Sequence, residues 1–245
     1  MKIVAFNGSP RGIKGNTFII LNEINHGVER AGASMEIVNL SEYDIHMCTG
    51  CFKCWDKYEG KEIKCVFQDD TNELLNKMKK ADMVLFSSPL YYDNISSLLK
   101  MFIERFIQMH TAYVVQREKI WVHDIELKSP KIAFLCSCDL PGLYNFDIVS
   151  LYMKKVSWNL QSELVAEIYQ NEARLIQWPS EAMKIMVSSQ KKVWEQTGYE
   201  LATDGKLSGK TIELLRRPMI PYKYYIESAN EIANETVLRE KKRRG

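Results

Sequence analysis

A ten-residue polar loop lies close to the amino terminus, between a strand-like run and a helical one. It reads Gly-Ser-Pro-Arg-Gly-Ile-Lys-Gly-Asn-Thr over residues 8–17, after the apolar run 2–7 and before the periodic segment 18–30. A helix start leaves its first N–H groups unpaired and carries the positive end of the macrodipole, and glycines let the backbone wrap closely around an anion. This succession of strand, loop and helix therefore predicts a phosphate-binding site.

The side chains and the glycine spacing of this loop narrow the choice of ligand. Ser9, Asn16 and Thr17 offer hydrogen-bond donors, and Arg11 offers a positive charge. The loop lacks the Gly-Lys-Ser/Thr of a P-loop, and its glycines do not fit G-x-G-x-x-G, so ATP and a dinucleotide bound in the usual way are disfavoured. A mononucleotide phosphate is favoured. The alternative is an ordinary tight turn between strand and helix, although such turns are normally roughly two to six residues long.

Composition and charge indicate a globular α/β protein and give no sign of a membrane span or of nucleic-acid binding. The chain has 245 residues, 46% of them hydrophobic, which is enough for a large α/β core. No run reaches the roughly 20 apolar residues of a membrane span, and no signal-peptide pattern is present, so a cytoplasmic protein is expected. The 33 basic and 31 acidic residues nearly cancel, which gives no indication of nucleic-acid binding, and the basic run 239–244 is interpreted as a solvated helix end.

Apolar runs bounded by turn signals alternate with segments of helical periodicity, which is typical of a parallel sheet covered by helices. Strands are expected at residues 2–6, 34–39, 83–87, 131–137 and 164–169. Helices are expected near residues 17–31, 71–80, 96–109 and 147–160. The pattern predicts a doubly wound α/β fold, with a five-stranded parallel sheet of order 2-1-3-4-5 and helices on both faces. Its ligand would lie at the carboxyl ends of the strands, where the loops 8–17, 88–95 and 137–145 converge.

Two segments exceed this minimal fold. Residues 110–130 are long for a connection and are expected to have structure of their own. Residues 179–245 carry two expected helices, 180–197 and 222–243, so the chain divides into a domain of residues 1–178 and a helical carboxy-terminal extension, packed on the same domain or on a partner subunit. Large apolar residues in the two segments would form an association surface if exposed together, which predicts a homodimer or homotetramer. These residues are Tyr113, Trp121, Trp178, Trp194, Tyr222, Tyr224 and Tyr225.

The loop after the third expected strand suits a flat ligand. It reads Ser-Ser-Pro-Leu-Tyr-Tyr-Asp-Asn-Ile-Ser over residues 87–96. A proline and two tyrosines at the mouth of a parallel sheet offer flat apolar surface beside backbone polar groups, which matches a planar heteroaromatic ring. Tyrosines are also common in cores and interfaces, so the interpretation depends on the neighbouring phosphate loop.

The two motifs G-S-P-R-x3-G-N-T and S-P-L-Y-Y-x2-I-S-x2-L-K-x-F-I-E-R together resemble the flavodoxin-like NAD(P)H-dependent FMN reductase family over residues 1–105. The resemblance implies FMN as cofactor, NADH or NADPH as co-substrate, and hydride transfer through flavin N5 to a quinone, a nitro or azo compound, a metal or a protein acceptor. Hydride transfer requires no side-chain acid or base, so none is assigned. The residues implied to hold the FMN phosphate, its ring and its outer edge are Ser9, Arg11, Gly15, Asn16, Thr17, Pro89, Leu90, Tyr91, Tyr92, Asn94, Ser137, Cys138 and Asp139.

Four of the six cysteines crowd into one short segment, at Cys48, Cys51, Cys54 and Cys65. Two consecutive C-x2-C steps place three thiolates on a tight loop, with Cys65 as a candidate fourth ligand, as in a tetrahedral metal site or at the corners of an iron–sulfur cube. The segment resembles the iron–sulfur flavoprotein branch of the family, which binds a [4Fe–4S] cluster beside FMN.

A cluster-free loop is the favoured interpretation of this segment, because ten residues separate Cys54 from Cys65 and because Phe52 and Trp55 offer an apolar anchor without metal. The [4Fe–4S] cluster comes second and zinc third. A non-enzymatic electron carrier is the alternative function, although the net charge of +2 does not suggest the one-signed surface that such carriers use for steering. The neighbouring Asp69 and Asp70 are expected to cap the following helix.

Overall fold

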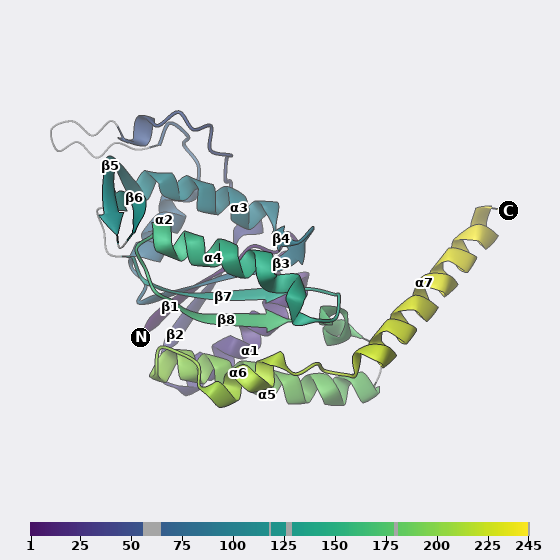
Figure 1. Cartoon of the computed structure of the whole chain (residues 1–245). Coiled ribbons are helices and arrows are strands. Elements are labelled where there is room, and N and C mark those ends of the chain that lie inside the picture. The colour runs from purple at the N-terminus through teal and green to yellow at the C-terminus, as the bar shows by residue number, and fades with distance from the viewer. Residues whose placement is uncertain (56–64, 118, 126–128, 179–180, 245) are drawn as a thin grey trace.

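A parallel five-stranded sheet forms the centre of the computed structural model, which describes residues 1–55, 65–117, 119–125, 129–178 and 181–244 (Figure 1). The strands are β1 (Lys2–Asn7), β2 (Ser34–Asn39), β3 (Met83–Tyr91), β7 (Lys131–Ser137) and β8 (Leu164–Gln170). They are ordered β2-β1-β3-β7-β8, so β2 and β8 form the two edges. The predicted doubly wound order 2-1-3-4-5 is confirmed. A short strand, β4 (Asn94–Ile95), pairs antiparallel with the end of β3.

The central strands are buried on both faces, which explains their continuous apolar sequences. In β1, Val4 and Phe6 belong to the core on one face, whereas Ile3 and Ala5 belong to the core on the other. The first face is covered by α2 (Thr71–Lys79), α3 (Ser97–Glu104) and α4 (Asp147–Asn159). The second is covered by α1 (Asn16–Arg30), α5 (Glu181–Thr203) and α6 (Gly209–Arg216).

Two glycines let α1 and α5 approach each other unusually closely. A Cβ atom on Gly27 would lie 1.8 Å from the carbonyl oxygen of Glu195, and one on Gly198 would lie 1.8 Å from that of Ile24. The indole of Trp194 on α5 is fully buried and donates to Oε1 of Gln170 over 3.2 Å. Helix α5 is therefore part of the core that covers the sheet. The boundary at residue 178 stays a prediction.

Several elements differ from the sequence prediction. The helix expected at 96–109 ends at Glu104 and continues as a 3-10 helix, η4 (Arg105–Met109). The segment 110–130 does have structure of its own, an antiparallel hairpin of β5 (His110–Arg117) and β6 (Ile120–Ile125). Helix α5 extends six residues beyond the expected end at 197, and α6 was not predicted.

The last helix, α7 (Tyr222–Arg244), projects away from the body of the molecule (Figure 1). Tyr225 anchors its first turns, in a small apolar cluster with Leu175 and Ile220. The expectation that seven aromatic residues form one exposed surface is therefore wrong for Tyr225 and for Trp194, which are both buried within the chain. Among the residues that the structure describes, no helix is long and apolar enough to cross a membrane.

Candidate functional site

Three loops meet at the carboxyl edge of the sheet, where the strand order reverses between β1 and β3. Together with the residues after β8 they enclose a cavity of about 290 Å³. Its lining consists of Ser9, Arg11, Gly15, Asn16, Thr17, Pro89, Leu90, Tyr91, Ser137, Cys138, Asp139, Ala173 and Arg174. All the residues expected in the flavin site thus line one cavity, except Tyr92 and Asn94.

The first loop forms a cradle that excludes larger side chains. A Cβ atom on Gly8 would lie 2.6 Å from Cβ of Leu99, and one on Gly15 would lie 2.6 Å from Oγ of Ser9. Gly15 is also the N-cap of α1, and no side chain caps the helix there. The first N–H groups of α1 therefore have no intrahelical acceptors, and they face a small, polar cavity. This combination fits the terminal phosphate of a mononucleotide.

Side chains of this loop also connect it to distant parts of the chain. The Asn16 amide donates to the carbonyl oxygen of Ala173 over 2.7 Å and accepts from Gln177 over 2.6 Å. The hydroxyls of Thr17 and Ser137 lie 3.1 Å apart. Asn16 is thus committed to positioning the start of α1, which leaves its backbone N–H for an anion. Among the described residues, the guanidinium of Arg11 has no ion-pair partner and is available to a ligand.

The second loop contributes a flat wall and a tight turn. Leu90 pairs with Ile95 and Tyr91 with Asn94 across a two-residue hairpin, whose central residues Tyr92 and Asp93 have φ angles of 49° and 59°. Left-handed angles at both positions are typical of a type I′ turn. The turn directs Tyr92 into solvent and holds Asn94 in the short strand, which is why neither lines the cavity.

The third loop, residues 137–145, is held in place by residues that the sequence analysis did not identify. The carboxylate of Asp139 forms an ion pair with Arg174, and the hydroxyl of Tyr225 lies 2.6 Å from the Asp139 carbonyl oxygen. Burial, reinforced by the negative charge of Asp139, raises the pKa of Cys138 to about 12, so this thiol stays neutral. Ala173 and Arg174 lie in the first turn after the last strand of the sheet, three and four residues beyond Gln170. The rule that ligands lie beyond the carboxyl ends of strands could have identified them.

The four cysteines considered as metal ligands lie beside a separate, small cavity of about 10 Å³, next to the residues that follow α3. All four, Cys48, Cys51, Cys54 and Cys65, line it. Burial raises the pKa of Cys54, whereas a hydrogen bond from the Lys53 backbone lowers the pKa of the exposed Cys51. The described residues include no group of three or more His, Cys, Asp or Glu side chains arranged to hold a single metal ion. Four thiols around one cavity are nevertheless the donor set of an iron–sulfur cube, in which each cysteine binds a different iron.

A buried arginine connects the two ends of the four-cysteine segment. Arg105 donates to the carbonyl oxygen of His46 over 2.9 Å and to Sγ of Cys65 over 3.2 Å. It also forms a two-pronged ion pair with Asp69, and both side chains are almost completely buried. Asp69 does accept from the Thr71 N–H over 3.2 Å, as a cap would, but its main partner is Arg105, which the capping prediction missed.

Apolar contacts anchor the same segment, as the sequence suggested. The indole N–H of Trp55 donates to the carbonyl oxygen of Ile107 over 2.9 Å. Its ring lies 4.8 Å from that of Phe52 and 4.6 Å from that of His123 on β6. The hairpin β5–β6 therefore supports the cysteine segment. Residues 56–64, which include most of the insertion before Cys65, lie outside the described residues.

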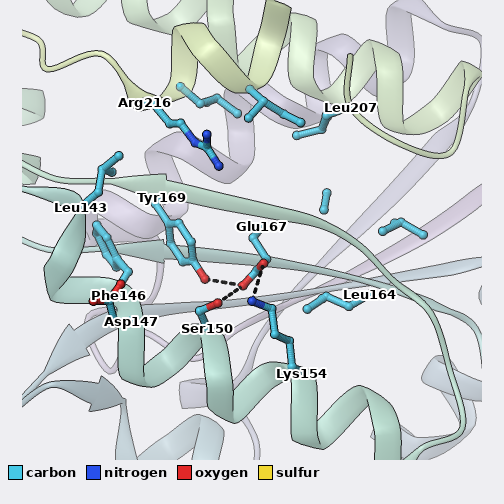
Figure 2. Close-up of a pocket in the computed structure, with 14 residues that line it drawn as sticks. Leu143, Phe146, Asp147, Ser150, Lys154, Leu164, Glu167, Tyr169, Leu207 and Arg216 are labelled. Atoms are coloured by element: carbon cyan, nitrogen blue, oxygen red, sulfur yellow. Dashed lines mark hydrogen bonds and ion pairs between the residues drawn. The ribbon is translucent and has the colours of Figure 1, made fainter. Parts of the chain in front are cut away.

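A larger cavity, about 530 Å³, lies elsewhere, between α4, β8 and α6 (Figure 2). Glu167 is its polar centre and accepts from the hydroxyls of Ser150 over 2.6 Å and Tyr169 over 2.7 Å. Lys154 lies 3.6 Å from the same carboxylate. The cavity flanks an edge strand, and its lining includes no residue of the loops 8–17 and 88–95, so its size does not make it the candidate site.

Comparison with known proteins identifies the family of this chain. A family model described as NADPH-dependent FMN reductase matches residues 1–123. An iron–sulfur flavoprotein of Methanocaldococcus jannaschii is 37% identical over 105 residues, which are 43% of this chain and 51% of the relative. An iron–sulfur flavoprotein of Archaeoglobus fulgidus is 36% identical over 105 residues, 43% of this chain and 48% of the relative. The match thus spans about half the length of these curated relatives.

Solved structures show the same fold across most of the chain. An NAD(P)H:quinone oxidoreductase from Methanothermobacter marburgensis aligns with a TM-score of 0.59 over 82% of this chain and 96% of the other, at 15% identity. At that identity the likeness concerns the fold alone. The family model, by contrast, covers half of the sequence and includes both motifs of the site. The chain therefore belongs to the NADPH-dependent FMN reductase family.

Proposed function

We propose that this protein is an FMN-dependent oxidoreductase that oxidises NADH or NADPH and reduces an electron acceptor. The observation that carries the proposal is the cavity formed by the three loops at the carboxyl edge of the sheet. FMN bound there would accept a hydride from the nicotinamide and release the electrons to the acceptor. Family membership supports the cofactor and the donor, whereas the acceptor could be a quinone, a nitro or azo compound, a metal or a protein.

The residues of the chain have distinct parts in this proposal. Ser9, Arg11 and the start of α1 hold the phosphate, because they combine a hydroxyl, an unpaired charge and free N–H groups. The wall made by Pro89, Leu90 and Tyr91 orients the ring, and the third loop closes its outer edge. Since Cys138 stays protonated and Asp139 is paired with Arg174, neither is assigned as a proton donor.

Analysis of bound flavin tests the proposal directly. Denatured protein should release FMN, and NADH or NADPH should bleach the flavin absorbance of the native protein without oxygen. The double variant Arg11→Ala/Thr17→Ala should weaken FMN binding by about 2–4 kcal/mol, which corresponds to one charge-assisted and one neutral hydrogen bond. Lys14→Ala is the matched control, because Lys14 has the same charge in the same loop but does not line the cavity. Recovery of FAD alone, or equal losses in both variants, would contradict the assignment.

A second candidate function is stepwise electron transfer through a [4Fe–4S] cluster. Two observations favour it over the cluster-free loop expected from the sequence. The four thiols line one cavity, with a buried guanidinium on Cys65, and the curated relatives are iron–sulfur flavoproteins. If the segment binds a cluster, its ligands are Cys48, Cys51, Cys54 and Cys65. The positive charge of Arg105 then partly balances the negative charge of the thiolates.

Iron and sulfide analysis distinguishes a cysteine segment that binds a cluster from one that does not. Anaerobically purified protein should contain about four irons and four sulfides per chain, and Cys51→Ala should lose them. Cys136→Ala, a change of a buried cysteine outside the segment, should retain them. Iron-free protein that still reduces its flavin with NADH or NADPH would refute the cluster and leave the oxidoreductase proposal standing.

We also propose that the chain associates with itself, as the exposed aromatic residues of the hairpin β5–β6 suggested. Tyr113 and Trp121 are indeed exposed there. Sedimentation at micromolar concentration tests this, and a strictly monomeric protein would contradict it.

A further inference from the structure

The cavity between α4, β8 and α6 has no part in the proposed oxidoreductase reaction, yet it has the size of a ligand site (Figure 2). Its volume of about 530 Å³ lies within the roughly 300–1,000 Å³ that is usual for ligand pockets. We call this cavity the β8 groove. Its apolar lining includes Leu143, Phe146, Leu164, Leu207, Ile212 and Leu215.

One side of the β8 groove is the free edge of the central sheet. β8 is an edge strand, and in the part of the chain that the structure describes no strand pairs with its outer side. The carbonyl oxygen of Gln170 accepts from the Cys138 N–H over 2.9 Å, so the backbone of Gln170 faces β7. Because the backbone groups of successive residues point to opposite sides of a strand, those of Glu167 and Tyr169 point outward, and both residues line the groove. The groove therefore offers N–H and C=O groups that an added strand can bind.

The charged side chains of the groove leave one positive charge for a ligand. Glu167 is already engaged, because its Oε1 accepts from Ser150 and Tyr169 and its Oε2 lies 3.6 Å from Lys154. Arg216, in the last turn of α6, lines the groove from the opposite side (Figure 2). Within the described residues its guanidinium has no hydrogen-bond or ion-pair partner. A guanidinium beside apolar surface fits a carboxylate, which it binds through two parallel hydrogen bonds.

The balance of charges and the shape of the groove define the ligand further. The lining contains two acids, Asp147 and Glu167, and two bases, Lys154 and Arg216, so no net charge attracts a polyanion. A single carboxylate at the end of an apolar segment fits this balance. Helices α4 and α6 flank the edge on its two sides, which leaves room for one extended chain. The sheet edge of a second copy does not fit there, because that edge is flanked by helices of its own.

We infer that the β8 groove binds the extended carboxyl-terminal segment of a partner protein, as an additional strand beside β8. Arg216 binds the terminal carboxylate, and side chains of the segment point alternately toward α4 and toward α6. Arg216 lies near the carboxyl end of β8, because the N–H of Met219, three residues later, donates over 2.8 Å to Glu172, just beyond that strand. The added strand is therefore parallel to β8. This inference goes beyond the proposed oxidoreductase function and does not depend on it.

A library of synthetic pentapeptides, labelled with fluorescein at the amino end, tests the groove by fluorescence anisotropy. Members with apolar residues at alternate positions and a free carboxylate should bind with dissociation constants below about 100 µM, and the same peptides with a terminal amide at least about 10-fold more weakly. Arg216→Ala should bind both forms equally weakly. Arg217→Ala is the matched control and should keep the preference, because Arg217 pairs with Glu213 and does not line the groove.

Backbone pairing is tested separately by amide hydrogen exchange. The amides of Glu167 and Tyr169 should exchange more slowly when a peptide is bound, whereas those of Ile168 and Gln170, which face β7, should not change. Methylation of single peptide nitrogens should abolish binding at every second position only, because alternate N–H groups face β8. Equal binding of acid and amide, or bound peptide without slower exchange at Glu167 and Tyr169, would overturn the inference. Failure of every library member to bind would overturn it as well.

The flavin variant keeps this test independent of the oxidoreductase proposal. Arg11→Ala/Thr17→Ala changes the flavin cavity, which shares no lining residue with the β8 groove, so it should bind the peptides as the unmodified protein does. Loss of peptide binding in this variant would place the peptide in the flavin cavity and overturn the inference.

Discussion

At the scale of single residues, the buried pair of Arg105 and Asp69 is the contact most sensitive to substitution. Both side chains are shielded from water, and Arg105 also holds the backbone at His46 and the thiol of Cys65. Removing one partner leaves the other charge buried and unpaired, so Arg105→Met should cost about 3–5 kcal/mol of unfolding free energy. Urea titration measures this. Lys100→Met is the control, since its exposed pair with Glu104 should contribute less than about 1 kcal/mol.

Two cysteines should show opposite reactivity for reasons of burial. Burial raises the pKa of Cys138 to about 12, whereas a backbone hydrogen bond lowers the pKa of Cys51. Because the folded chain holds the Cys138 proton more tightly than the unfolded chain, this thiol stabilises the fold fully below its ordinary pKa of 9.0, and the contribution is lost as the pH rises toward 12. Iodoacetamide at pH 9 should therefore alkylate Cys51 but not Cys138 in native, iron-free protein. Mass spectrometry of the peptides would reveal the opposite order if this is wrong.

At the scale of elements, the contact between α1 and α5 has no tolerance for added volume. A methyl group on Gly198 would meet the backbone at Ile24, which cannot move without shifting α1. Gly198→Ala should therefore cost about 1–3 kcal/mol or more, although alanine is the better helix former, and Gly209→Ala, which meets open space, should not destabilise the fold. Thermal unfolding of the two variants measures the contrast, and equal melting temperatures would disprove it.

The central strands were predictable from sequence because each is an apolar run buried on both faces, and this pattern depends little on distant contacts. The carboxy-terminal half was harder to predict. Gly27 and Gly198 lower the helix propensity of their segments. Only the contact between α1 and α5 explains why glycine is required at these two positions. The 3-10 ending of α3 likewise depends on long-range contacts, since Arg105 turns there toward His46 and Cys65.

At the scale of the whole molecule, the cavity at the carboxyl edge of the sheet was predictable where its residues lie within the two motifs. Ala173 and Arg174 were missed because they reach the cavity from the far end of the chain: the bond between Asn16 and Ala173 spans 157 positions. Tyr92 and Asn94 do not line the cavity, and the left-handed turn that directs them away from it is not evident from their residue types.

Truncation tests how much of the chain the fold requires. A chain that ends at residue 178 lacks Trp194 and Leu201, which are fully buried on the sheet, and it should not give a cooperative unfolding transition. A chain that ends at residue 217 keeps α5 and α6 and should unfold cooperatively. It should bind FMN more weakly, because the contact of Tyr225 with Asp139 is lost. Circular dichroism during heating measures the cooperativity of unfolding, and flavin titration measures FMN binding. Cooperative unfolding of the shorter chain would establish residues 1–178 as an independent domain.

The glycine contact between α1 and α5 also constrains how such a chain can evolve. The match to the family model ends at residue 123, yet the helix α1, which follows the loop 8–17, packs on backbone contributed some 70 residues later. Recombination that joins this amino-terminal half to a foreign carboxy-terminal half would therefore fail unless the incoming helix also carried a glycine opposite Ile24. The fold of the first half thus depends on the second, although the family model matches only the first.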